Sequence, residues 1–273
     1  DVTVRELWIY PVKSCQGIAL SQSVLTPEGL EHDRRWAILD SEGRCLTQRK
    51  LPAMALIATA IDQHGYLTLS APGKEPITIK INHCTKRVTA GVWSSTVDAL
   101  LAPQSCNQWL SEFLGIESSL VYFDPCYRRA LDAKRFGQNA TGFADAAPYL
   151  VANKASLNLL QRKLPSIENF SLSMLNFRPN IVIEGVEAFE EYQYQSLSTA
   201  KWQLNLIDPS IRCSMIGVDP AKGEQVGGSA ALKGVAALSS AKDNPKAPIF
   251  GVNSTLAGES FSAIRCGDSA RLV

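Results

Sequence analysis

The sequence of 273 residues lacks a long hydrophobic run and a charge imbalance, and each absence excludes a class of protein. The richest apolar segment, residues 54–61, is far shorter than the roughly 20 residues that a membrane-spanning helix needs. A net charge of +1 gives no electrostatic reason to expect nucleic acid or an anionic membrane as a partner. We therefore expect a soluble, monomeric globular protein that binds neither nucleic acid nor membrane.

The sequence also has no closely spaced cysteine pair and no histidine beyond its first third. Its seven cysteines lie too far apart for a zinc knuckle or a ferredoxin-type cluster. An odd number of cysteines at irregular spacing is typical of a reduced protein, which predicts a cytoplasmic location. The histidines are His32, His64 and His83, so a downstream nucleophile can pair with a histidine only between domains. No GxGxxG motif follows a predicted strand, so no flavin or nicotinamide site is predicted.

The first half of the sequence contains a series of short strand patterns with almost no helical periodicity. Segments rich in β-branched and aromatic residues are separated by turn signals such as Ser41-Glu42-Gly43 and Pro72-Gly73. The predicted strands cover residues 2–10, 17–25, 35–39, 54–61, 66–69, 77–81 and 87–93. Many short strands at this spacing predict a twisted antiparallel sheet or barrel.

The second half mixes helical and strand patterns. Helices are predicted at residues 105–114, with Gly115 as the C-cap, and at residues 154–164. Further strands are predicted at residues 120–123, 149–152, 181–183, 202–207 and, after a turn, at the end of 267–273. Residues 124–148 predict a long loop, and we expect a mobile loop at residues 227–241. Together these patterns favour an α+β fold, mainly β.

Residues 208–220 contain the strongest candidate for chemistry, Cys213. Arg212 precedes it, and Pro209 and Pro220 restrict the backbone torsions at the two ends of the segment. The segment predicts a stiff loop that leads into a short strand, with Cys213 at the junction. A thiolate in such a place serves as a nucleophile or as a soft metal ligand. The alternative is a buried structural thiol, because free cysteine is among the most buried residue types.

Three short clusters at predicted strand ends share a polar, largely cationic character. They are Lys13-Ser14, residues 176–180 with Arg178, and residues 211–213, and Arg34 and Arg35 could join them. Arginine binds phosphate through a bidentate fork, and lysine binds it as a point charge. The clusters therefore predict a ligand that carries phosphate and makes many hydrogen bonds.

Taken in order, these motifs resemble those of a known family. The motifs that resemble the N-terminal β-barrel domain of MOSC proteins are Tyr10-Pro11-Val12-Lys13-Ser14-Cys15-Gln16-Gly17 and Asp33-Arg34-Arg35-Trp36. Those that resemble the MOSC domain itself are residues 176–180, Arg212-Cys213, Val218-Asp219-Pro220 and Gly267-Asp268. The chain is similar end to end to the mitochondrial amidoxime-reducing component family and its bacterial YcbX-type relatives. The resemblance implies an N-terminal β-barrel-like domain at residues 1–124 and a MOSC β-barrel with peripheral helices at residues 125–273.

The resemblance also implies a molybdenum cofactor, Mo-molybdopterin, and a set of residues that bind it. Cys213 matches the cysteine that ligates molybdenum in an Arg-Cys-x5-Val-Asp-Pro pattern, and Arg212 flanks the metal. The other residues that the resemblance assigns to cofactor binding are Lys13, Ser14, Arg34, Asp145, Ala146, Arg178 and Asn180. The family's Ser-Asp-x-x-Pro stretch falls on residues 144–148, where the aspartate is retained but alanines replace the neighbouring hydroxyls.

The implied activity is the reduction of N-hydroxylated compounds (hydroxylamines, amidoximes and N-hydroxylated purines) by oxygen abstraction at molybdenum. Because the chain has no flavin, haem or iron–sulfur motif, we expect the electrons to come from a separate donor, a flavoprotein or a ferredoxin-type protein, or from a further domain outside this sequence. The expected docking surface is basic and consists of Arg128, Arg129, Lys134 and Arg135, although a solvated face remains the alternative for each. Two other functions stay open: a carrier that holds cofactor or sulfur on Cys213, and a β-barrel interaction protein with Cys213 in its core.

Overall fold

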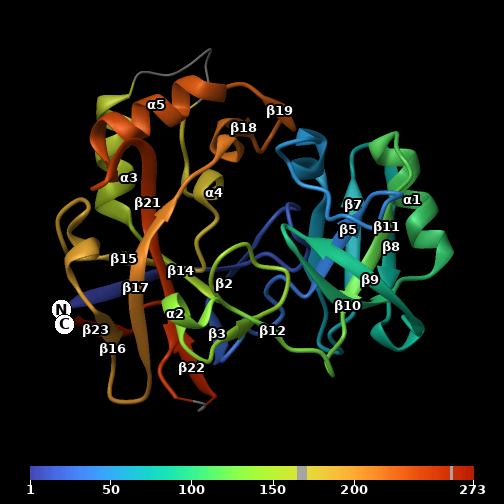
Figure 1. The fold of residues 1–273 in the computed structure, drawn as a ribbon, viewed down its shortest axis with the longest axis horizontal. Coiled ribbons are helices and arrows are strands. Elements are labelled where there is room, and N and C mark those ends of the chain that lie inside the picture. The colour runs from blue at the N-terminus through green and yellow to red at the C-terminus, as the bar shows by residue number, and fades with distance from the viewer. Residues whose placement is uncertain (165–170, 259–260) are drawn as a thin grey trace.

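A closed seven-stranded barrel forms one side of the molecule, the left in Figure 1. The computed structural model describes residues 1–164, 171–258 and 261–273. Around the barrel the strands are β14 (Tyr149–Asn153), β15 (Ile181–Glu184), β1 (Val2–Ile9), β23 (Ser269–Leu272), β16 (Ser196–Ser198), β17 (Gln203–Ile211) and β21 (Asn244–Leu256). β21 pairs back with β14 and closes the barrel. Closure gives each strand a neighbour on both sides and leaves no free edge.

Strand β1 shows how the sequence fits this barrel. The side chains of Val2, Val4, Leu7 and Ile9 are all buried in the barrel core. In a regular strand every second side chain faces the core, so residue 6 and not residue 7 would be expected to follow Val4 there. The pairing of β1 with β15 shifts its register between Val4 and Glu6. Such a bulge changes the phase of the alternation, so apolar side chains before and after it point to the same core.

The other side of the molecule contains two smaller sheets around a second core, the right in Figure 1. One sheet has the order β5 (Trp36–Leu39), β11 (Ser119–Phe123), β10 (Ser95–Leu101) and β9 (Lys86–Val92). The other is the meander β6 (Ala58–Ile61), β7 (Leu67–Ala71) and β8 (Lys74–Ile79). Helix α1 (Gln104–Leu114) packs on them through Trp109 and Leu110 and ends at Gly115, whose backbone is left-handed as a C-cap requires. The predicted fold, α+β and mainly β with a barrel, is confirmed.

The chain begins and ends in the same barrel. β1 pairs with β23, and Figure 1 shows the two termini side by side. The next strands, β2 (Ile18–Leu20) and β3 (Gln22–Thr26), pair with β1 and with β22 (Ser262–Arg265), and β4 (Gly29–Leu30) pairs with β3. The division after residue 124 stays a prediction, and the strands of the first 30 residues pair with one another or with strands that follow that division.

Several sequence predictions of secondary structure are wrong or incomplete. Residues 227–241, predicted as a loop, contain helix α5 (Gly228–Leu238), which turns Ala231 and Val235 into a core shared with helix α3 (Lys154–Lys163). Its glycines and alanines gave little periodicity, but small side chains permit this close packing. Residues 54–61 begin in the 3₁₀ helix η1 (Pro52–Leu56) rather than in a strand, because Pro52 favours a helical first turn. Strands β10, β16, β21 and β22 were not predicted.

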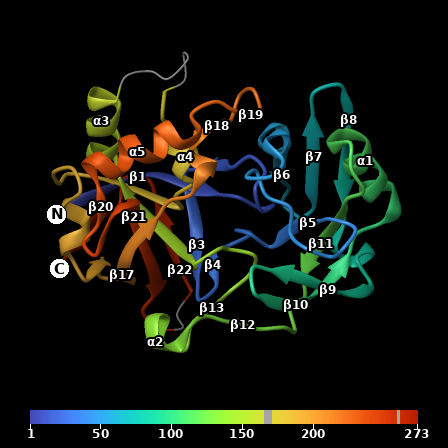
Figure 2. The same ribbon diagram turned by 45° about the horizontal axis from the view of Figure 1, so that its top comes forward.

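The remaining elements are short. They are η2 (Ile81–His83), β12 (Arg129–Ala130), α2 (Ala133–Phe136), β13 (Ala140–Thr141), α4 (Met174–Phe177), η3 (Glu190–Gln193), η4 (Ser214–Gly217), β18 (Val218–Asp219), β19 (Glu224–Gln225) and β20 (Ser240–Ala241). Figure 2 shows α4 and the β18–β19 hairpin between the barrel and the smaller sheets. Across the described ranges, no helix has the length and apolar character needed to cross a membrane.

Candidate cofactor site

A cavity is lined by loops from both halves of the sequence, and it contains every residue that the sequence assigned to the cofactor. These nine residues are Lys13, Ser14, Arg34, Asp145, Ala146, Arg178, Asn180, Arg212 and Cys213. Arg35, the additional candidate, does not line it. Its guanidinium pairs with Glu28 at 2.6 Å and lies over the Phe123 ring.

Cys213 lies where β17 gives way to the 3₁₀ helix η4. The predicted stiff loop that leads into a short strand is therefore wrong on both sides of the cysteine, since β17 runs to Ile211 and η4 separates Cys213 from β18. The Asn176 side chain donates hydrogen bonds to the carbonyls of Ile216 and Val218, at 3.1 and 2.9 Å. A Cβ on Gly217 would lie 2.4 Å from the Gly228 nitrogen, so this turn packs directly on the start of α5. The cysteine is half-buried on a backbone that is held from two sides.

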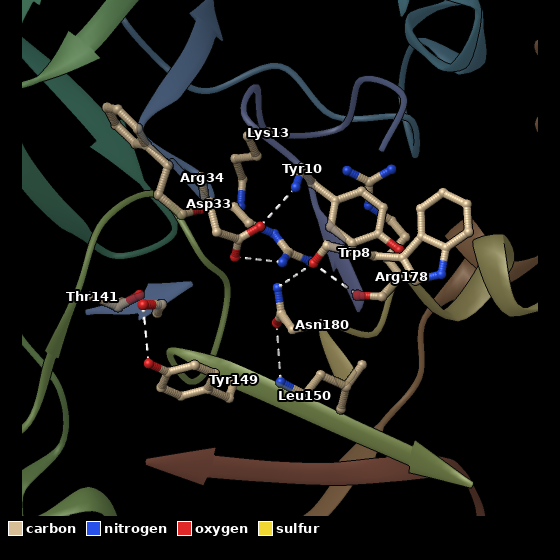
Figure 3. A network of polar contacts seen from close by, with 12 residues as sticks. Trp8, Tyr10, Lys13, Asp33, Arg34, Thr141, Tyr149, Leu150, Arg178 and Asn180 are labelled. Atoms are coloured by element: carbon tan, nitrogen blue, oxygen red, sulfur yellow. Dashed lines mark hydrogen bonds and ion pairs between the residues drawn. The ribbon is translucent and has the colours of Figure 1, made fainter. Parts of the chain in front are cut away.

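Two arginines that are 144 positions apart in the sequence lie over one tyrosine ring. The guanidinium carbons of Arg34 and Arg178 are 4.3 and 4.1 Å from the centre of the Tyr10 ring, and Figure 3 shows the three side chains together. Arg34 donates to Asp33 at 2.6 Å and to the Arg178 carbonyl at 3.1 Å. Arg178 donates to the Cys15 carbonyl at 2.7 Å. Two guanidinium charges thus share one neighbouring carboxylate, so the cluster keeps an excess of positive charge.

The electrostatics of this cluster favour an added anion. Burial and the neighbouring Arg34 charge lower the pKa of Arg178 to about 10. Burial also lowers the pKa of Arg212 and raises that of Tyr10. The pKa of a buried cation falls because the charged form loses hydration, and an anion bound beside it would reverse the effect.

Three of the nine cavity residues have a left-handed backbone that only glycine adopts freely. The φ angles are 66° at Ser14, 47° at Arg34 and 56° at Arg178. Each such residue costs on the order of 1 kcal/mol, and such strain is concentrated at functional sites. The conformation turns side chains from three separate loops into one cavity.

Lys13 and Asp145 form an ion pair at the cavity wall. The Lys13 ammonium is buried, and it also donates to the Phe143 carbonyl at 2.9 Å. The indole nitrogen of Trp93 donates to the same Asp145 oxygen at 2.9 Å. Although burial opposes ionisation, the Lys13 charge and these hydrogen bonds hold the pKa of Asp145 well below its usual range.

Comparison with known proteins places this chain in a family. The MOSC N-terminal beta barrel domain matches residues 1–117, and the MOSC domain matches residues 138–271. The chain belongs to the MOSC-domain family. The resemblance inferred from the motifs is therefore confirmed, and both matched segments contribute residues to the cavity.

Similar proteins carry names that refer to molybdenum or to amidoximes. Mitochondrial amidoxime-reducing component 1 of Mus musculus is 32% identical over 235 residues, which cover 81% of this chain and 67% of that protein. The Homo sapiens protein of the same name is 31% identical over 239 residues with the same coverage. Molybdenum cofactor sulfurase of Bos taurus is 29% identical over 241 residues, but these cover only 27% of its length.

The residues of this MOSC protein fit a cofactor that carries phosphate and a soft metal. Arg178 Nη2 and Arg212 Nε are buried and have no hydrogen-bond partner within the described part of the chain. The other nitrogens of Arg212 donate to Ser210 Oγ at 3.0 Å and to the Phe177 carbonyl at 2.7 Å, which fixes the guanidinium plane. Buried donors of this kind call for an acceptor. Phosphate supplies such acceptors, and Cys213 supplies a soft ligand.

Asn180 also holds barrel strands together in this MOSC fold. Its side-chain oxygen accepts from the Leu150 nitrogen at 3.1 Å, and its side-chain nitrogen donates to the Trp8 carbonyl at 3.2 Å (Figure 3). These bonds tie β1, β14 and β15 together at the cavity. Its assignment to cofactor binding stays a prediction.

Sequence reasoning did not find Arg49 and Trp93. Arg49 Nη1 lies 3.6 Å from Cys213 Sγ and 3.8 Å from Met215 Sδ, and the Arg49 guanidinium lies 4.5 Å from the centre of the Trp93 ring. Arg49 lies between two predicted strands, Trp93 is the last residue of another, and neither stands in a motif. Only the fold brings them to a cysteine that is more than 100 positions away in sequence.

Proposed function

We propose that this MOSC protein is a molybdenum-cofactor-dependent reductase of N-hydroxylated compounds. The proposal rests on one observation: the Cys213 thiol shares a cavity with Arg178 and Arg212, both of which have unpartnered buried donors within the described residues. Family membership supports it, as do relatives whose names describe amidoxime reduction. The substrates that we propose are hydroxylamines, amidoximes and N-hydroxylated purines.

In this proposal the chain binds and orients Mo-molybdopterin, and the bound cofactor supplies the redox chemistry. Cys213 provides a thiolate ligand, and Arg212 beside it stabilises negative charge near that sulfur. Arg34 and Arg178, fixed over Tyr10, hold the phosphate. Lys13 holds Asp145 ionised at the cavity wall, where the carboxylate can receive a hydrogen bond from a ligand.

A second function has a specific observation in its favour. Molybdenum cofactor sulfurases of several species align with 80–81% of this chain. A protein that carries the cofactor, or sulfur on Cys213, for delivery elsewhere would need the same cationic cavity. It would not need a second substrate or an electron donor.

Chemical analysis of the purified full chain separates the two functions. Molybdenum and pterin in equal amounts to protein, with reduction of an N-hydroxylated purine by an artificial electron donor, would support the reductase. A persulfide on Cys213 without metal would support the carrier. If the purified protein carries neither the molybdenum cofactor nor a persulfide, the remaining interpretation is a non-catalytic interaction protein.

The reductase would take its electrons from a separate flavoprotein or ferredoxin-type protein, and we propose a cytoplasmic location. Of the four predicted docking residues, Arg129 is half-buried and donates to the carbonyls of Gly142 and Ala144 at 3.0 and 2.6 Å. Arg135 is exposed but forms an ion pair with Asp208. Arg128 also donates to a carbonyl, that of Gln138 at 2.5 Å, but Arg128 and Lys134 are exposed and form no ion pair within the described residues. They are therefore the better candidates for contact with an acidic donor.

A further inference from the structure

The β9–β10 hairpin carries a tryptophan in an unusual place. Trp93 and Ser94 form its two-residue turn, since Val92 pairs with Ser95. Trp93 has a left-handed backbone, with φ of 55°, and its side chain is 65% exposed. Such turns favour glycine, asparagine or aspartate at left-handed positions. A bulky aromatic residue that is both strained and exposed belongs to none of the hydrophobic cores in the described part of the chain, which points to contact with a ligand.

The position of the indole is fixed relative to the cofactor site. Its nitrogen donates to Asp145 at 2.9 Å, and Asp145 is paired with Lys13 in the cavity wall. Ile211, which lines the cavity two residues before Cys213, is also 65% exposed. The surroundings of the cavity thus include two large apolar side chains, one of them aromatic.

A planar, nitrogen-rich group already lies between this indole and Cys213. It is the Arg49 guanidinium, which is 4.5 Å from the centre of the Trp93 ring while its Nη1 is 3.6 Å from Cys213 Sγ. One guanidinium therefore spans the gap between the ring and the sulfur. An amidoxime has a similar planar, delocalised core, in which carbon replaces one of the three guanidinium nitrogens and another nitrogen carries a hydroxyl group. The amidine formed by its reduction is a cation like arginine.

We propose that Trp93 is the substrate platform, on which planar amidine-type groups stack beside Cys213, and that Arg49 occupies this platform when no substrate is bound. The inference rests on the proposed reductase function and specifies its substrate class. Planar amidoximes and N-hydroxylated amino-heterocycles gain the stacking contact. Non-planar N-alkylhydroxylamines do not, so Trp93 sets the preference between them.

Binding of benzamidine, a planar amidine that cannot be reduced at nitrogen, tests the platform without any turnover. Calorimetry on the full chain should give about tenfold weaker binding for Trp93→Ala, and a smaller loss for Trp93→Phe, which keeps a flat ring. Arg49→Ala should bind benzamidine more tightly, because it removes the internal competitor. Phe261→Ala is the matched control, since Phe261 is a similarly exposed aromatic residue that lines a different cavity.

Three results would overturn the inference: no binding by the wild type, equal binding by Trp93→Ala, or weaker binding by Arg49→Ala. Steady-state kinetics then test the preference. The ratio of kcat/KM for benzamidoxime to that for N-methylhydroxylamine should fall in Trp93→Ala. An equal loss of kcat/KM for both compounds would contradict the platform and would mean that Trp93 acts only by holding Asp145 in place. If no molybdenum-loaded variant reduces either compound, the proposed function fails, and the benzamidine result still decides the platform.

Discussion

At the scale of single residues, Cys213 is the most direct test of the proposed chemistry. Cys213→Ser should abolish N-hydroxylated purine reduction, because molybdenum prefers a thiolate to a hydroxyl. Serine is close in size and the site is half-buried, so the melting temperature should change little. Turnover and Tm are measured on the same preparation, with Cys126→Ser, an exposed cysteine, as the control. Substantial turnover by Cys213→Ser would contradict the assignment of this cysteine as a molybdenum ligand.

Arg178 is expected to act on the cofactor and not on the substrate. A charge-assisted hydrogen bond contributes about 1.5–3 kcal/mol, so Arg178→Ala should weaken cofactor binding about ten- to a hundredfold. The measurement is pterin and molybdenum content per chain, with Arg5→Ala, an exposed arginine, as the control. Normal content combined with altered substrate preference would move Arg178 to the substrate pocket.

Much of the site could be read from the sequence, because Lys13, Arg34, Arg178 and Cys213 stand in recognisable motifs. Arg49 could not, since it stands in no motif and approaches Cys213 across 164 positions of sequence. Their contact is tertiary, and no local pattern predicts it.

At the scale of elements, the sequence predicted the helices and strands whose apolar residues recur at a regular spacing. Helix α1 has a clear stripe that includes Trp109 and Leu110, and Gly115 marks its end. Helix α5 has only alanines, glycines and a few aliphatic residues, so its buried face does not stand out from its exposed face. Its stability comes from packing on β21 and α3, which the sequence of the helix alone does not reveal.

The junction of α3 with η3 provides a pH-dependent test of the element packing. The buried Glu191 accepts from Ser156 Oγ at 2.9 Å and from Asn153 Nδ2 at 3.0 Å, and Asn153 also caps α3. Burial raises the pKa of Glu191 in the folded state. The neutral carboxyl is favoured there, so the associated stability is complete below the unfolded pKa and is lost as pH rises through the folded one.

Glu191→Gln keeps the shape and removes the charge. It should therefore have a higher Tm than the wild type at pH 8, and the difference should shrink toward about pH 4, where both states of the wild type are protonated. Thermal unfolding across this range is the measurement, and Glu117→Gln, an exposed site, should show no such trend. A Tm difference that is independent of pH would mean that hydrogen bonding, and not ionisation, decides the effect.

At the scale of the whole molecule, docking of the electron donor depends on long-range attraction between surface charges. The double reversal Arg128→Glu and Lys134→Glu should lower turnover with a protein electron donor and leave turnover with a small chemical donor unchanged. The loss should fall as salt is added, since exposed charges are screened. Equal loss with both donors would place these residues at the cofactor, and no loss would leave them as a solvated face.

The closed barrel makes a second prediction at this scale. Residues 125–273 alone lack β1, which lies between β15 and β23, so this fragment should show no cooperative thermal transition. Joining residues 1–35 to it restores β1 to β4 and should restore a transition. Cooperative unfolding of residues 125–273 by themselves would show that the barrel closes without β1.

The pairing of Val2 with Ala270 also has a consequence for biosynthesis. β1 is synthesised long before β23, so it has both of its barrel neighbours only after β23 has been made, and the intervening sheets can fold meanwhile. Pairing across nearly the whole chain gives a high contact order, which slows folding because loop closure precedes the stabilising contacts. During synthesis the apolar face of β1 stays without its complete core, which leaves the nascent chain prone to aggregation until β23 has been made.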